Sequence, residues 1–152
     1  MKLRTLLLAA SIAAMPVVIA APAANAEPPI YTARFSNLAV QGYDPVAYFT
    51  DGMPVKGSDA FTTEYMGATF QFSSAANRDA FVADPAKFAP QYGGYCAWAM
   101  ADGNYAKGDA KFWRIVDGKL YLNYNAGVQK KWVKDIPGFI SKADTEWAER
   151  ND

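Results

Sequence analysis

The sequence contains no histidine and a single cysteine, Cys96. Without histidine the chain cannot form a Ser-His-Asp triad or a histidine metal cluster, and it lacks the side chain that titrates near neutral pH. With one cysteine it cannot form an internal disulfide or a Cys-x-x-Cys redox pair. These absences favour a non-enzymatic protein, and we expect it to use no cofactor.

The balance of charge excludes further classes of partner. Basic and acidic residues number 15 each and are scattered along the chain. Loss of Lys2 and Arg4 with an amino-terminal signal would leave 13 basic against 15 acidic residues, a net charge of about −2. Such a surface has no general electrostatic attraction for nucleic acid or for an anionic membrane. We therefore expect neither as a partner.

The first 26 residues have the pattern of a cleaved signal peptide. Lys2 and Arg4 precede an apolar stretch over residues 6–14, and Ala-Asn-Ala at 24–26 is a small-x-small cleavage site. Two prolines within the segment argue against a membrane anchor. We predict cleavage after Ala26, no integral membrane span in the mature chain and a periplasmic location.

The remaining 126 residues are enough for one domain with a hydrophobic core. We predict an extended lead-in over residues 27–41 and a single domain over residues 42–150. The periplasm is oxidising, yet this chain has no second cysteine with which to form a disulfide. Its stability must therefore come from burial of its many aromatic and aliphatic side chains.

Alternating apolar residues and turn dipeptides predict three β-hairpins. Residues 46–49 resemble a strand that runs into an Asp-Gly turn at 51–52. Residues 61–65 and 68–72 alternate on either side of Met66-Gly67. Residues 112–116 and 119–124 flank Asp117-Gly118, which suits the positive φ angles of a type I′ turn.

Capping signals predict short helices between and after the hairpins. Ser73 or Ser74 can cap a helix over residues 75–82, and Asp84-Pro85 begins another that stops at Pro90. Further helices are expected over residues 95–101, from Asn125 to about 134, and from Pro137 to about 149. We find no internal repeat. The expected class is α+β, with antiparallel hairpins packed with short α-helices.

The order of several motifs resembles the YHS domain family. The residues that carry the resemblance are Gly42-Tyr43-Asp44-Pro45-Val46, Thr69 to Ser74, Asn77 to Phe81, Asp84-Pro85 and Lys87-Phe88. They span about residues 42–88, the core module. Residues 89–150, with Tyr92 to Ala97 and Asp117 to Asn125, resemble the extension of an exported subgroup, and families similar to it are described as including selenoproteins.

The resemblance implies the fold and not a metal site. The small YHS modules of metal-handling proteins typically carry cysteines at positions that correspond to Ala47, Ser73 and Asn77 in this sequence. A methyl group, a hydroxyl and an amide cannot replace thiolates toward a soft ion. We therefore predict that this chain has lost the metal site of those modules.

Cys96 is the candidate reactive residue. It follows Gly93-Gly94 at the expected start of a helix, where unpaired backbone N–H groups and the helix dipole would stabilise a thiolate and lower the thiol pKa. The resemblance implies that a selenocysteine would stand at this position. Our leading hypothesis is a non-enzymatic binding or thiol-redox accessory module centred on Cys96. The alternative is a small buried residue between Tyr95 and Trp98.

Two further hypotheses remain open at this point. Cys96 and Met100 are spaced i, i+4, so both sulfurs could bind Cu(I) from one helix face. Alternatively, the chain is an interaction domain with a structural cysteine, whose partner is an envelope protein or a small ligand. For such binding we select aromatic residues and the glycines beside them, namely Tyr43, Tyr92, Gly93, Gly94, Tyr95 and Trp98.

Overall fold

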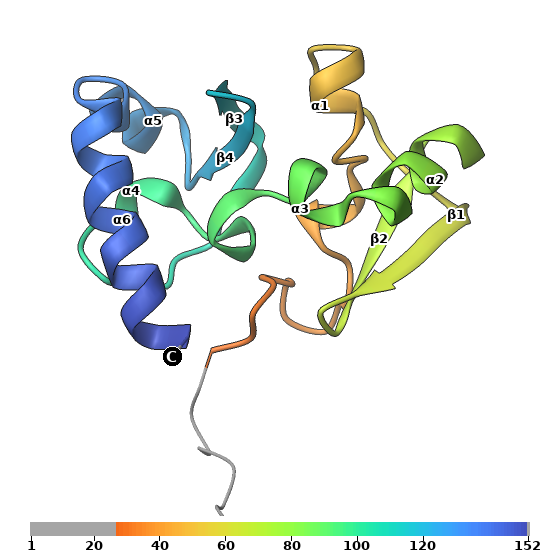
Figure 1. Ribbon diagram of the computed structural model, residues 1–152, viewed down its shortest axis with the longest axis horizontal. Helices are drawn as coiled ribbons and strands as arrows, with labels where there is room; N and C mark the ends of the chain where they lie inside the picture. Colours follow the sequence, from red (N-terminus) through yellow and green to blue (C-terminus); the bar gives the residue numbers. More distant parts are fainter. Residues whose placement is uncertain (1–26, 152) are drawn as a thin grey trace, which may run out of the picture.

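Two antiparallel β-hairpins, each followed by a helix, form the framework of the protein. The structure is a computed structural model that describes residues 27–151, so the predicted signal peptide lies outside the described residues. The first half comprises η1 (Val40–Gly42), α1 (Ala47–Thr50), β1 (Ser58–Tyr65), β2 (Ala68–Phe72), α2 (Ala75–Ala83) and α3 (Pro85–Phe88) (Figure 1). The second half comprises η2 (Gln91–Gly94), α4 (Ala97–Met100), β3 (Asp109–Val116), β4 (Lys119–Asn123), α5 (Ala126–Trp132) and α6 (Ile136–Asn151). The predicted α+β class is confirmed.

The two halves repeat one structural unit. Each begins with a 3-10 turn and a one-turn α-helix, continues with a hairpin of an eight-residue and a five-residue strand, and then forms a capped helix. The pair Thr62 and Gln71 recurs 51 positions later as Trp113 and Leu122, and every other pair of the two registers is shifted by the same amount. The expectation of no internal repeat is therefore wrong. We call residues 40–88 the first unit and residues 91–132 the second unit.

Local sequence signals explain why both units form the same hairpin and helix. The turn residues Met66 and Gly67 have φ of 49° and 83°, and Asp117 and Gly118 have φ of 49° and 73°. A type I′ turn needs positive φ at both central positions, so the two hairpins predicted at these turns are confirmed. The side chains of Ser74 and Asn125 accept hydrogen bonds at the starts of α2 and α5, as their predicted capping roles require.

The hairpin predicted at Asp51-Gly52 is wrong. Residues 47–50 form helix α1, because the Asp44 carboxylate accepts hydrogen bonds from the N–H groups of Val46 (2.9 Å) and Ala47 (3.3 Å). An aspartate that satisfies the free N–H groups of a first turn starts a helix, and a following proline fits that turn. The alternation of apolar residues predicted a strand here, but the hydrogen bonds to Asp44 stabilise a helix instead.

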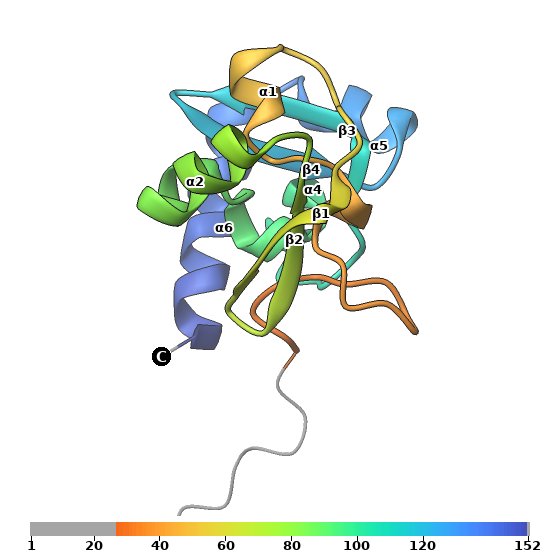
Figure 2. The ribbon, with the colours of Figure 1, turned by 90° about the vertical axis from the view of Figure 1, so that its right-hand side faces the viewer.

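The lead-in also differs from an extended segment. Residues 30–39 form a loop that projects beside the β1–β2 hairpin (Figure 2). Thr32 pairs with Ala39, and a turn between them places Phe35 at φ 66° with 95 % of its surface exposed. Further along, residues 40–42 already belong to η1.

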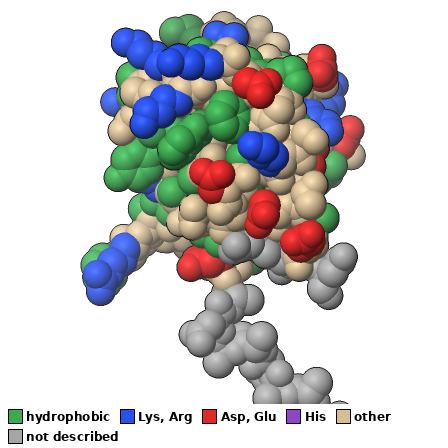
Figure 3. Space-filling model, turned by 90° about the vertical axis from the view of Figure 1, so that its left-hand side faces the viewer, with side chains coloured by type: hydrophobic (Ala, Val, Ile, Leu, Met, Phe, Trp, Pro, Cys, Tyr) green, Lys and Arg blue, Asp and Glu red, His purple; other side chains and the backbone are tan. Residues whose placement is uncertain are grey.

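Strand β4 lies between two hydrophobic clusters. Leu120 and Leu122 pack into the cluster that contains the first unit's core. Tyr121, on the opposite face, packs with Trp132 in the second cluster. Helix α6 covers this second cluster and buries Ala143 in it. Lysines lie beside an apolar area on the side of the molecule formed by α5 and α6 (Figure 3). No helix among residues 27–151 is both long and apolar enough to cross a membrane.

Hydrogen bonds from two side chains of the first unit join it to the start of strand β3 and to Gly108 just before it. Gln41 donates through Nε2 to the Gly108 carbonyl (2.9 Å) and accepts through Oε1 from the Ala110 N–H (2.8 Å). The buried Tyr48 hydroxyl donates to the Ala110 carbonyl (2.7 Å). Burial raises the pKa of Tyr48, so this donor stays protonated.

We predict that Tyr48→Phe lowers the free energy of unfolding by about 1–3 kcal/mol, because the buried Ala110 carbonyl loses its donor. Urea denaturation measures the change. Tyr124→Phe is the control, since the Tyr124 side chain is exposed, and it should leave stability near that of the wild type. Equal stabilities for wild type and Tyr48→Phe would contradict the role given to this bond.

Candidate functional site

A buried carboxylate lies among the three positions to which the resemblance assigns cysteines. Asp44 has no exposed surface, and its Oδ2 accepts hydrogen bonds from the Ser73 N–H (2.9 Å), the Ser73 hydroxyl (2.7 Å) and the Asn77 amide (2.7 Å). Its Oδ1 accepts the two N–H groups of α1 described above. A carboxylate has about four acceptor positions, so five donors saturate it.

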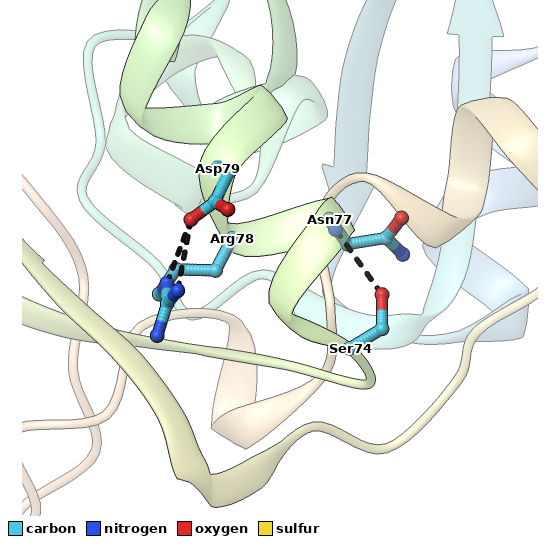
Figure 4. A network of polar contacts seen from close by, with 4 residues as sticks. All are labelled: Ser74, Asn77, Arg78 and Asp79. Carbon is cyan, nitrogen blue, oxygen red and sulfur yellow. Dashed lines mark hydrogen bonds and ion pairs between the residues drawn. The ribbon is translucent and has the colours of Figure 1, made fainter.

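The start of α2 presents Asn77 to this carboxylate. Ser74 accepts the Asn77 N–H (3.1 Å) and fixes the first turn of the helix, while the Asn77 amide extends away from the Arg78–Asp79 ion pair (Figure 4). The resemblance assigns thiolate positions to Ala47, Ser73 and Asn77, and these three residues instead donate to Asp44. Within the described part of the chain, no group of three or more His, Cys, Asp or Glu side chains is placed to hold a metal ion.

Cys96 is fully buried, which agrees with the alternative of a small buried residue and not with a thiolate stabilised at a helix start. Residue 96 forms a parallel bridge with Leu122, so strand β4 covers it. Burial raises the pKa of the thiol, and the N–H groups of Ala99, Tyr124 and Trp98 oppose this effect without overcoming it. The predicted lowering of the pKa is therefore wrong in direction, because desolvation outweighs the local N–H groups.

The remaining sulfur ligand proposed from the sequence is also buried. Met100 has no exposed surface and packs in the second hydrophobic cluster. Its position one turn after Cys96 agrees with the predicted helix, although α4 spans only residues 97–100. Hydrocarbon packing accounts for this side chain.

A pocket of about 260 Å³ lies where the two units meet. Tyr65 and Met66 contribute from the β1–β2 turn, Tyr92 and Gly93 from η2, and Trp147 from α6. Tyr92 and Gly93 belong to the ligand-binding set selected from the sequence. The sequence reasoning did not select Tyr65, Met66 or Trp147. An apolar Met66 at a turn position that favours Asn, Asp or Gly is a signal that could have pointed to this pocket.

The backbone beside this pocket adopts the left-handed conformation at two successive residues. Tyr92 is a non-glycine residue at φ 54°, and Gly93 follows at φ 60°. A Cβ atom on Gly93 would lie 1.9 Å from the Pro29 carbonyl oxygen, so only glycine fits. The Tyr92 hydroxyl donates to Asp144 (2.8 Å), and burial followed by this hydrogen bond raises its pKa. These contacts hold the Tyr92 ring in place.

The other selected binding residues lie elsewhere. Gly94 and Tyr95 are buried, and the Tyr95 hydroxyl donates to the Pro28 carbonyl (3.0 Å). Tyr43 and Trp98 are half-buried. Lys56 Nζ lies 3.9 Å from the Tyr43 ring centre, and Lys131 Nζ lies 5.2 Å from the Trp98 ring centre. Only two of the six predicted residues therefore line the pocket.

The first half of the chain is thus a small module in which a hairpin and short helices surround the fully hydrogen-bonded Asp44 carboxylate. Residues 46–92 match the family model described as YHS domain. The chain therefore contains a YHS domain, which confirms the resemblance drawn from the sequence for the core module. The second unit lies almost wholly beyond the matched residues. No curated protein and no solved structure matches the chain.

We predict that a bulky thiol reagent reacts with Cys96 at least about tenfold more slowly in the folded protein than in the unfolded chain. The thiol is buried and its raised pKa keeps it protonated near neutral pH. Reaction with 5,5′-dithiobis(2-nitrobenzoate), with and without guanidinium chloride, measures the ratio. A folded rate equal to the unfolded rate would mean that the sulfur is accessible.

Proposed function

We propose that this chain is a non-enzymatic binding module of the bacterial cell envelope that holds a small uncharged group in the pocket between its two units. The observation that carries the proposal is the lining of that pocket by the rings of Tyr65, Tyr92 and Trp147. Ligand sites are mostly apolar and aromatic with few polar groups. The volume of about 260 Å³ is just below the usual range for such sites, which favours a single ring or short side chain.

The chemistry of the lining selects against charged ligands. All the lining side chains are uncharged, and the Tyr92 hydroxyl is engaged by Asp144. A charged group would lose its hydration here and gain no ionic partner. Aromatic rings instead favour the edge or face of another ring. The ligand class is therefore an uncharged aromatic or aliphatic group, free in solution or displayed on an envelope protein.

The two sulfur-based alternatives have less support. A thiol-redox module needs Cys96 to meet a partner thiol, and a fully buried sulfur with a raised pKa opposes that exchange. A Cu(I) carrier needs Cys96 and Met100 to be reached by the ion, and both are fully buried. An interaction or ligand-binding role requires neither sulfur to be exposed.

We predict that indole binds in the pocket and that Ala86→Trp abolishes this binding. Ala86 is exposed on α3 at the pocket lining, so a large side chain there can fill the space without entering the core. Titration followed by NMR should shift the amide signals of Met66 and Gly93 in the wild type. Ala83→Trp is the matched control, because Ala83 is exposed and lies outside the pocket.

Indole shifts that persist in Ala86→Trp, or that fall only on residues remote from the pocket, would contradict the assignment. Retention of binding by Ala83→Trp is required, since its loss would indicate a general effect of added surface tryptophan.

The proposed envelope location carries its own prediction. We expect the protein isolated from the periplasm to begin at Glu27, because cleavage is predicted after Ala26. Intact-mass measurement of fractionated cells tests this. A full-length chain retained in the cytoplasm would contradict the location, while the pocket would remain testable on the purified protein.

A further inference from the structure

Cys96 occupies in the second unit the place that Asp44 occupies in the first. Each follows a Gly-Tyr pair, and each precedes a one-turn helix. The Asp44 N–H donates to the Val55 carbonyl (2.8 Å), and the Cys96 N–H donates to the Ala106 carbonyl (2.9 Å). The repeat therefore relates a buried carboxylate to a buried thiol.

The backbone donors around the two side chains correspond as well. The Asp44 carboxylate accepts the N–H groups of Val46, Ala47 and Ser73, which come from two separate segments of the first unit. These three residues surround an anion with two acceptor oxygens. The first unit thus shows which chemical group this arrangement of N–H donors can hold.

In the second unit the corresponding N–H groups favour the anionic form of the Cys96 thiol. The N–H groups of Trp98 and Ala99 stand 52 positions after those of Val46 and Ala47, and the N–H of Tyr124 stands 51 positions after that of Ser73. We call these three groups the Cys96 cradle. A neutral thiol offers them one weak acceptor, where a carboxylate offers two strong ones.

A buried amide beside the sulfur has one atom without a partner. Asn123 has no exposed surface, its Oδ1 accepts a hydrogen bond from the Cys96 thiol (4.0 Å), and its Nδ2 has no hydrogen-bond partner. A buried donor that is left unsatisfied destabilises the fold. The residue at this position in the first unit is Phe72, so the polar amide is specific to the unit that contains the thiol.

We propose that Cys96 is an oxidation site for hydrogen peroxide and that the cradle and Asn123 hold its sulfinate. A sulfinate carries one negative charge and two oxygens on the atom next to Cβ, as the Asp44 carboxylate does. Its oxygens give the three N–H groups two acceptors. They also give the Asn123 amide an acceptor, because an amide can turn its nitrogen toward a neighbouring anion.

The chemistry proceeds in two balanced steps. The thiol loses its proton, the thiolate attacks one peroxide oxygen, the O–O bond breaks, and sulfenic acid and water form. A second peroxide oxidises the sulfenic sulfur in the same way and gives sulfinate, a proton and water. Each step oxidises sulfur by two electrons and reduces one peroxide. The chain has no second cysteine that could divert the sulfenic acid into an internal disulfide.

Burial sets the rate of this reaction. The raised pKa leaves little thiolate, so oxidation is slow and requires millimolar peroxide or prolonged exposure. Peroxide is much smaller than a partner protein or a bulky thiol reagent, and it reaches sulfur through local opening of the fold. The modification is independent of the ligand pocket and can be tested apart from it.

The test treats the mature protein with hydrogen peroxide and follows it by peptide mass spectrometry and thermal unfolding. We expect a mass gain of about 32 Da on the peptide that contains Cys96, with little of the further gain that marks sulfonate. We expect the oxidised protein to unfold at a temperature equal to or above that of the reduced protein. Peptides with Met53 and Met66, which are exposed, report methionine oxidation separately.

Two variants test whether the protein tolerates a buried negative charge only at position 96, where the cradle can bind it, or at a neighbouring buried position as well. Cys96→Asp should fold with a melting temperature at or above that of Cys96→Ser, because it supplies the carboxylate that the first unit holds. Ala97→Asp is the matched control, since Ala97 is 1 % exposed and lies beside the cradle, and it should lower the melting temperature by about 3 °C or more. Asn123→Leu should make oxidation destabilising.

Three results would overturn the proposal. One is a wild-type sulfinate that unfolds at a clearly lower temperature than the thiol. Another is oxidation of Met53 and Met66 while Cys96 in the folded protein stays reduced. The third is a Cys96→Asp variant that is as unstable as Ala97→Asp.

Discussion

The burial of a carboxylate is the constraint on which the first unit depends. An ionised Asp44 without solvent would be costly, and only a full set of donors makes its position tolerable. Those donors come from the start of α1, from the end of β2 and from α2. The requirement therefore fixes three segments that are distant in the sequence against one another. A set of internal hydrogen bonds occupies the place to which the resemblance assigns metal-binding thiolates.

The repeat shows how one backbone arrangement serves two different centres. The second unit keeps the register of the hairpin, the position of the helix cap and the backbone donors, yet it replaces the carboxylate by sulfur. Its stability is supplied differently. Strand β4 is buried on both faces, and α6, which follows the second unit, covers a cluster rich in aromatic rings. The lone cysteine is accommodated within this packing.

Elements with local signals could be predicted, and elements decided by distant contacts could not. Both confirmed hairpins are specified by two turn residues. Helix α1 was missed although Asp44-Pro45 is the same signal as Asp84-Pro85, because the apolar alternation that follows it favours a strand. The burial of Cys96 depends on its pairing with Leu122, which no local pattern indicates.

The repeat and the pocket were missed for related reasons. Few identities persist between the units, among them Tyr43 with Tyr95 and Lys56-Gly57 with Lys107-Gly108, and these are too sparse to reveal a period by inspection. The pocket joins a turn near residue 66 to a helix near residue 147. Only the packed structure brings them together.

The bonds from Gln41 and Tyr48 to strand β3 have a consequence for recognition. They hold together the two halves that line the aromatic pocket, so the shape of the pocket is fixed by the fold. For the binding proposed above, this means that a ligand would lose little affinity to the ordering of the protein. Selection among ligands would then rest on their size and ring shape.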